Sequence, residues 1–319
     1  MTINEFTKLA FDETKRVMKE KGIDGQAELT SVVKANDLVK QGICIRRKGT
    51  NVGPNLYLDQ IHTRYENGEP LHSLVEELVD SFLRSEHVAC PEEEFLNMDF
   101  ETIEPMLRVR VVDTKCNEKY LQTVLHFGDR GSGLVYIPEI RVEKDRGFWG
   151  AVVTKAMAEE HCYPLGRLYK AAIRNSIRED PPRLICLSRA IDDYGQDCPN
   201  LLESDEPITP DVLVLTSYSA QFGAYAMLQK FVLEHTEKIV GSFHILPSSR
   251  HELIVVPDAM PLEEDYLREM VRSANKTVVS AEDFLSDDIF HYSHDTGLCR
   301  CKEEILEEEP RQCFVAEGY

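Results

Sequence analysis

Apolar residues near the N-terminus recur every three to four positions, which is the period of an amphipathic helix. This pattern predicts a helix over residues 3–21 and a second helix that begins just after Pro70. Short apolar segments with the length of strands lie between the two helices, at 29–33, 42–46 and 56–59. The N-terminal part of the chain is therefore expected to mix helices with strands.

Beyond residue 105, short apolar runs alternate with helical stretches. The pattern predicts a helix over about 103–124, a hairpin of strands at 133–142 and 147–154, and a helix at 164–176. Further predicted elements are strands at 211–217, 239–246 and 252–256, helices at 228–238 and 262–273, and a hairpin that joins 289–293 to 298–301. Because strands and helices come in clusters, the fold class is predicted to be α+β, with mixed or antiparallel sheets and repeated strand–strand–helix units.

A change of composition suggests the domain organisation. The segment from Cys90 to Glu104 carries six acidic residues and no basic ones, and the residues after 301 are again strongly acidic. We expect an N-terminal α/β subdomain at 1–90, an acidic linker or loop at 91–104, a larger α+β domain at 105–301 and an acidic, mobile tail at 302–319.

Charge and composition exclude some classes of function. The formal net charge of −20 argues against a conventional nucleic-acid binder, because contacts to phosphates need clustered Lys and Arg. No apolar run approaches the roughly 20 residues that span a bilayer, and the N-terminus lacks the apolar core of a signal peptide. We expect a cytoplasmic protein with no membrane association, whose nine cysteines form no disulfide framework. An acidic surface keeps such a protein soluble or binds a basic partner.

One candidate catalytic group lies in the sequence ILPSSRHELIVVP. Ser248, Ser249, His251 and Glu252 stand on a connection between two apolar segments, and a serine with a nearby histidine is what nucleophilic catalysis requires. Neither serine lies in a G-x-S-x-G elbow, and His251-Glu252 is not followed by the second histidine of a zinc protease. The alternative is a turn whose short polar side chains bond to the local backbone, and we expect this structural role.

One candidate metal site lies in the sequence HYSHDTGLCRC. His291, His294, Cys299 and Cys301 are ligand types that zinc prefers. Their spacing is unusual, because C-x-C is tighter than the common gap and strand alternation places His291 and His294 on opposite faces. We expect no bound zinc at these residues. No phosphate-binding or dinucleotide-binding motif is present either, so no cofactor is predicted.

Several segments together resemble an uncharacterised bacterial family, a domain of unknown function often met in genomes rich in mobile elements. The segments are LYLDQIHTRYENGEPLHSLVEELV from Leu56, VLVLTSYSAQFGAYAML from Val212, FHILPSSRHELIVVP from Phe243 and SDDIFHYSHDTG from Ser286. They contain the patterns LT-x(6)-GA and ILPSS-x-HE. The resemblance implies no assigned activity. The function predicted from the sequence is a non-enzymatic binding or regulatory protein, with a protein as its partner. The alternative is a hydrolase with an unfamiliar site around Ser248 and His251.

Overall fold

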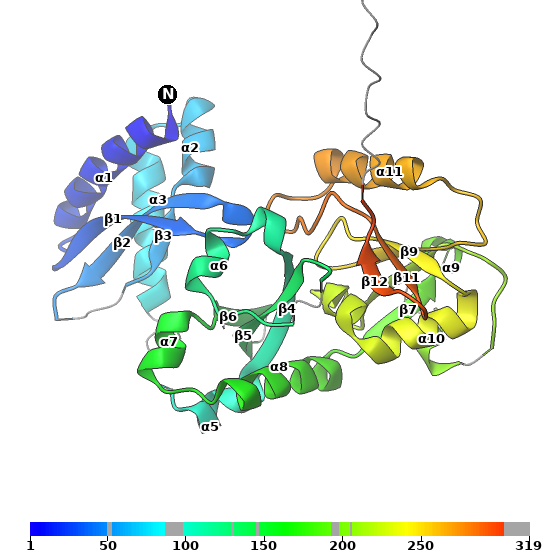
Figure 1. The fold of residues 1–319 in the computed structure, drawn as a ribbon. Coiled ribbons are helices and arrows are strands. Elements are labelled where there is room, and N and C mark those ends of the chain that lie inside the picture. The colour runs from blue at the N-terminus through cyan, green and yellow to red at the C-terminus, as the bar shows by residue number, and fades with distance from the viewer. Residues whose placement is uncertain are drawn as a thin grey trace, which may run out of the picture.

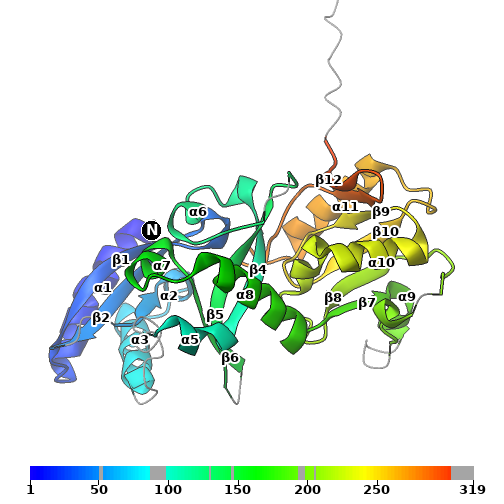
Figure 2. The same cartoon turned by 60° about the horizontal axis from the view of Figure 1, so that its bottom comes forward.

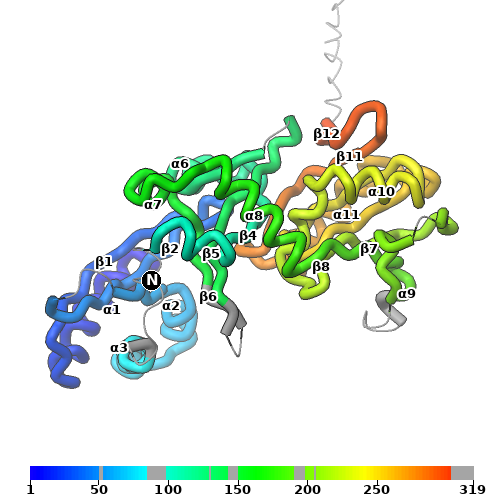
Figure 3. Tube along the Cα trace, turned by 90° about the horizontal axis from the view of Figure 1, so that it is seen from below, coloured from blue at the N-terminus to red at the C-terminus, as the bar shows by residue number. Residues whose placement is uncertain are grey.

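A computed structural model describes residues 1–49, 53–86, 98–128, 131–144, 147–192, 198–204 and 206–302. The chain forms three antiparallel sheets with helices packed on them, which confirms the predicted α+β class. The sheets lie in a row: a three-stranded N-terminal sheet, a three-stranded central sheet and a six-stranded sheet (Figure 1, Figure 3). No helix among these residues combines the length and the apolar character needed to cross a membrane.

The N-terminal sheet has the strand order β1-β2-β3 and carries its own apolar core. Isoleucines 43 and 45 of β2 point inward and pack against the helices, as the period of two in this strand predicts. The helices predicted near residue 3 and after Pro70 are both present. The elements are α1 (Ile3–Glu20), β1 (Gly25–Val33), η1 (Ala35–Asp37), β2 (Val39–Arg47), β3 (Asn55–Tyr57), α2 (Asp59–Glu66) and α3 (Leu71–Glu86).

The central sheet has the order β4-β5-β6. The helix predicted over 103–124 is wrong, because residues 107–113 form strand β4. Here Leu107, Val109 and Val111 are buried while the two arginines between them are half-buried, which is the alternation of a strand. The predicted hairpin of β5 and β6 is confirmed. The elements are α5 (Phe100–Ile103), η2 (Glu104–Met106), β4 (Leu107–Asp113), η3 (Thr114–Cys116), α6 (Tyr120–Thr123), β5 (Leu134–Lys144), β6 (Gly147–Val152), α7 (Lys155–Glu160) and α8 (Leu165–Glu179).

The six-stranded sheet has the order β12-β11-β9-β10-β8-β7. Helices α10 and α11 lie on opposite sides of this sheet (Figure 2). On strand β9, Phe243 and Ile245 face the core that includes α10, whereas Leu246 packs with α11. The elements are β7 (Pro182–Cys186), α9 (Leu187–Asp192), η4 (Leu201–Glu203), β8 (Leu213–Ser217), η5 (Gly223–Leu228), α10 (Lys230–Val240), β9 (Phe243–Leu246), β10 (Leu253–Pro257), α11 (Glu264–Thr277), β11 (Phe290–Ser293) and β12 (Gly297–Arg300).

There are two large apolar cores, and Phe100 and Ile103 at the end of the predicted linker belong to the second of them. One joins residues between Phe6 and Phe82, and the other runs from Phe100 to Tyr292 through both the central and the six-stranded sheet. Residues 91–97 of the linker and 303–319 of the tail lie outside the described residues, so the domain boundaries stay a prediction. The seven cysteines in the described part of the chain are all free thiols.

Candidate functional site

The segment Pro247–Glu252 connects the antiparallel strands β9 and β10, as the sequence predicts. Its backbone is bonded to a second loop. Leu285 N–H donates to the Ser248 carbonyl oxygen at 3.1 Å, and Arg250 N–H donates to the Asp283 carbonyl oxygen at 2.9 Å. The Ser249 hydroxyl accepts a hydrogen bond from His251 N–H at 3.1 Å, which is a local turn contact. Glu252 is exposed. The segment is thus held in place through its own main chain.

Both ring nitrogens of His251 are engaged. Phe222 N–H donates to Nδ1 at 3.1 Å, and Nε2 lies 2.9 Å from a carboxylate oxygen of Asp283. Because Nδ1 accepts a hydrogen bond, the ring proton lies on Nε2 and is donated to Asp283. A general base needs a nitrogen directed at the nucleophile. The four sequence candidates lie close together, but their geometry does not assemble a serine–histidine pair.

Replacing His251 by alanine is expected to lower the free energy of unfolding by about 1–3 kcal/mol, because Phe222 N–H and the Asp283 carboxylate both lose a partner. Ser249→Ala is expected to cost about 0.5–1.5 kcal/mol, since His251 N–H loses its acceptor. Thermal melts of both variants measure this. Ser248→Ala serves in a parallel screen for esterase and peptidase activity. A hydrolytic signal that depends on Ser248, with an unchanged melt, would contradict the structural role.

The bond to His251 holds Phe222 in an unusual position. Phe222 has a φ of 56°, in the left-handed region that non-glycine residues rarely adopt. Its ring is surrounded by three guanidinium groups, whose central carbons lie 4.6 to 5.1 Å from the ring centroid. We call this arrangement the guanidinium cluster; it consists of Phe222 with Arg110 from β4, Arg141 from β5 and Arg250 from the β9–β10 connection. An aromatic face attracts such cations.

The segments LT-x(6)-GA and ILPSS-x-HE meet at this cluster. The Thr216 hydroxyl and Gly223 N–H both donate to the His251 carbonyl oxygen at 3.0 Å, and Ala224 N–H donates to the Arg250 carbonyl oxygen at 3.2 Å. Glycine is required at 223, because a Cβ there would lie 2.7 Å from the His251 carbonyl oxygen. The two motifs on which the family resemblance rests therefore build one structure.

Carboxylates pair with the arginines of the guanidinium cluster. Glu139, which is fully buried, pairs with Arg110 and Arg141, and Asp283 pairs with Arg250 at 2.8 Å. Burial lowers the pKa of Arg250, and the positive charge of Arg110 lowers it further. The Nε atoms of Arg110 and Arg250 are buried without a hydrogen-bond partner among the described residues. Among the described residues, two carboxylates thus pair with the three guanidinium groups.

A cavity of about 880 Å³ adjoins the cluster, between the N-terminal sheet and strand β6 of the central sheet. Arg110 and Arg250 lie in its wall, with side chains about four-fifths buried. Lys34 lies over the Tyr57 ring at the N-terminal side, and Lys40 is already paired with Glu282 at 3.2 Å. The volume is within the range of sites that bind small molecules. The wall thus holds four cationic side chains together with two carboxylates, Asp59 and Glu282, which both pair with Lys40.

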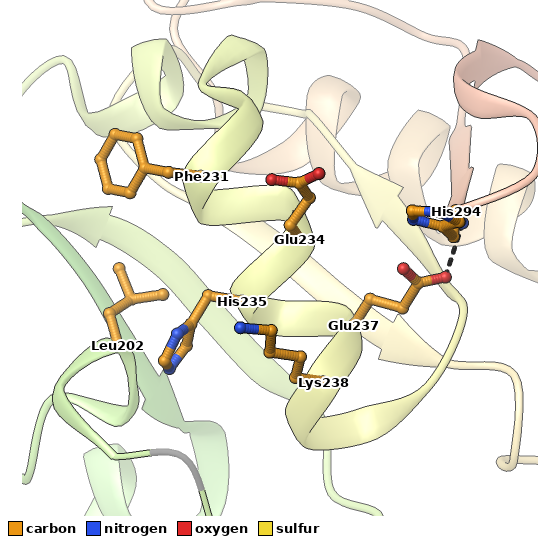
Figure 4. Close-up of a pocket in the computed structure, with 7 residues that line it drawn as sticks. All are labelled: Leu202, Phe231, Glu234, His235, Glu237, Lys238 and His294. Atoms are coloured by element: carbon orange, nitrogen blue, oxygen red, sulfur yellow. Dashed lines mark hydrogen bonds between the residues drawn. The ribbon is translucent and has the colours of Figure 1, made fainter.

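The structure does not bring the four predicted metal ligands together. His294 lies at the hairpin turn, where its backbone N–H donates to Glu237 of α10 at 2.6 Å (Figure 4). With residues of α10 it lines a cavity of about 570 Å³. This cavity lies on the side of the six-stranded sheet opposite α11. Cys299 is exposed and contacts the Thr296 carbonyl oxygen. His291 and Cys301 instead lie close to His244, which belongs to none of the predicted sets of ligands.

One comparison with known proteins gives a match. Residues 3–294 match the family described as "Family of unknown function (DUF5688)". The chain belongs to this family. The match includes every strand of the three sheets except β12, and it includes both apolar cores. Nothing matched among the curated proteins or among the solved structures. Membership in DUF5688 therefore brings no activity to this chain, and its function has to be inferred from its own residues.

The sequence interpretation missed the residues that form the guanidinium cluster of this DUF5688 protein. A signal for two of them is present. Arg110 occupies a polar position in the alternating run LRVRVV, and Glu139 interrupts the apolar strand GLVYIPEIRV. A charged residue inside an apolar strand is almost always paired when buried. The partner of each group was not predictable, because β4 pairs with β5 only through the tertiary fold.

Proposed function

We propose that this protein is a non-enzymatic cytoplasmic binding or regulatory protein that takes up a small anionic ligand in the cavity beside the guanidinium cluster and acts on a protein partner. The observation that carries the proposal is the pair Arg110 and Arg250, which line the cavity with buried Nε atoms that have no partner among the described residues. A planar guanidinium binds carboxylates and phosphates with two parallel hydrogen bonds.

The partial burial of Arg110 and Arg250 favours a role in ligand binding over a role in balancing the negative charge of the protein surface. An exposed pair of charges contributes little in water, but a partly buried cation acts in a medium of lower dielectric constant. The formal net charge of the chain is −20, so a cavity that presents cations differs from the average surface. Lys34 is exposed at the cavity wall and adds a further positive charge. The hydrolase alternative is not favoured, because both ring nitrogens of His251 are engaged.

The test is a thermal melt of the full chain with inorganic phosphate, pyrophosphate, ATP and citrate. A ligand at about 100 times its Kd is expected to add about 2.7 kcal/mol to the free energy of unfolding, because it binds only the folded chain. We expect at least one of these anions to raise the melting temperature, and Lys34→Gln to weaken that effect without lowering the melting temperature of the free protein.

The matched pair of variants is Arg250→Gln and Arg174→Gln. Arg250 lies in the cavity wall, whereas the side chain of Arg174 on α8 is 59% exposed and pairs with Glu104. Binding measured by calorimetry is expected to be lost in Arg250→Gln and kept in Arg174→Gln. If no anion shifts the melt, or if both arginine variants bind equally well, the assignment of the cavity to an anion is wrong.

A further inference from the structure

Two histidines lie side by side on the face of the six-stranded sheet that α11 covers. His244 of β9 is directly opposite His291 of β11 in the strand register, so both side chains leave the same face. Their ring centroids are 4.8 Å apart. Leu246, two residues along β9, packs with Leu267 and Val271 of α11, which fixes this face as the covered one. Two adjacent strands thus position both imidazoles.

A carboxylate lies between the two rings. Asp258 directly follows β10, and its backbone N–H donates to the Ser242 carbonyl oxygen at 3.0 Å. One Asp258 oxygen is 2.9 Å from His291 Nε2, and the other is 3.1 Å from His244 Nδ1. The ligand atoms of His244, Asp258 and His291 all lie within 4.8 Å of one another. The three groups converge on one point from three separate strands or strand ends.

A second carboxylate lies beside His244. Glu264, the first residue of α11, accepts a hydrogen bond from His244 Nε2 at 3.5 Å. The Nδ1 atom of the same ring lies 3.1 Å from an Asp258 oxygen, so each ring nitrogen of His244 faces a carboxylate. A metal ion at Nδ1 requires the ring proton on Nε2, where the Glu264 carboxylate accepts it. A carboxylate on the distal nitrogen is also the usual partner of a metal-binding histidine.

We propose that His244 Nδ1, His291 Nε2 and an oxygen of Asp258 bind a divalent first-row transition metal ion, with Glu264 holding His244 in the required tautomer. Imidazole nitrogens suit zinc and its neighbours, and two histidines with one carboxylate leave a position open for water or a ligand. On binding, the proton of His291 moves from Nε2 to Nδ1, so the ring stays neutral. The side chains of His244 and His291 are 14% and 27% exposed, which leaves a path for the ion.

A second set of three groups shares His244 and defines an alternative. His244, Glu264 and Cys301 also have ligand atoms within 4.8 Å of one another. In that set the ion would be bound by His244 Nε2 and the Cys301 sulfur. Burial, together with the negative charge of Glu264, raises the pKa of the Cys301 thiol to about 12. The shorter contacts of Asp258 favour the set with His291, and the spectrum of a bound ion distinguishes the two.

The test uses the full chain, freed of metal with a chelator and then titrated with Zn²⁺ against a chromophoric competitor. We expect one equivalent of saturable binding that is lost in Asp258→Asn and in His291→Gln. Glu264→Gln is expected to weaken binding by about 10–100-fold, as is typical for a residue that orients a ligand. Bound Co²⁺ is expected to show visible bands without the charge-transfer band of a thiolate.

The matched control is His294→Gln, which removes an exposed histidine three residues away in the same hairpin. It should bind zinc like the wild type, and Cys299→Ser should do the same. Melts without added metal show whether each variant is folded, and Asp258 is exposed enough for Asp258→Asn to keep the fold. The proposal is overturned if no equivalent binds, if Asp258→Asn and His294→Gln bind equally, or if a thiolate band appears and disappears in Cys301→Ser.

Discussion

Replacing Asp113 by asparagine is expected to lower the free energy of unfolding by about 1–3 kcal/mol, the range for a buried group that loses a hydrogen-bond partner. Asp113 ends β4 and is 1% exposed. Its two oxygens lie 2.8 and 2.9 Å from the two terminal nitrogens of Arg300 on β12, and one of them also accepts a hydrogen bond from the Ser286 hydroxyl. In the variant the guanidinium faces an uncharged amide and, among the described residues, keeps only Asp288 as its carboxylate partner.

The surroundings of Arg300 make this pair sensitive to small changes. The guanidinium passes over Gly133, where an added Cβ would lie 2.6 Å from one of its nitrogens, and its Nε donates to the Ser132 carbonyl oxygen. Arg300→Lys keeps the charge but loses the two parallel bonds, so we expect a smaller loss than for Asp113→Asn. Urea titration of both variants beside Asp12→Asn, a change at an exposed residue of α1, measures the difference. Equal stability of Asp113→Asn and Asp12→Asn would contradict the prediction.

Periodicity predicted the elements whose apolar residues face a single core. The helices α1, α3 and α8 and the hairpin of β5 and β6 lie where the pattern placed them. The helix predicted over 103–124 is wrong at β4. Leu107, Val109 and Val111 recur with the period of two of a strand, but the residues on either side continue a helical period, so the pattern over the whole stretch predicts one helix. Pairing of β4 with β5 then decides in favour of a strand. Short apolar runs carry this ambiguity until their partner is known.

The candidate site was predictable only in its local part. The turn at Ser248–Glu252 follows from the residues of the connection itself, and its role as a turn agrees with the observed backbone bonds. The guanidinium cluster and the pair His244–His291 join residues far apart in the sequence. Strand alternation predicts His291 and His294 on opposite faces, but His294 lies in the turn beyond β11. The identity of the strand beside β11 was needed to place His244 next to His291.

Glu139→Gln is expected to lower the free energy of unfolding by about 3–5 kcal/mol, because Arg110 and Arg141 would both lose the buried carboxylate with which they pair. Glu139 is fully buried at the centre of β5. The matched control is Glu69→Gln, which removes an exposed carboxylate from its pair with Arg64 and should leave stability nearly unchanged, since water screens that pair. Denaturant titration at neutral pH compares the two.

The same carboxylate predicts an acid limit of stability. Burial alone would raise the pKa of Glu139, but the charges of Arg110 and Arg141 and their hydrogen bonds outweigh it, so the pKa is lowered in the folded chain. A lowered pKa contributes stability above the ordinary glutamate pKa of about 4.3, and this contribution is lost as the pH falls through the folded value. Stability of the wild type is therefore expected to fall steeply below about pH 4. Glu139→Gln lacks this pH-dependent contribution. The difference in the free energy of unfolding between the wild type and the variant should therefore shrink as the pH falls. A difference that stays constant from pH 7 to pH 3 would show that folding does not shift the pKa of Glu139 and would contradict the prediction.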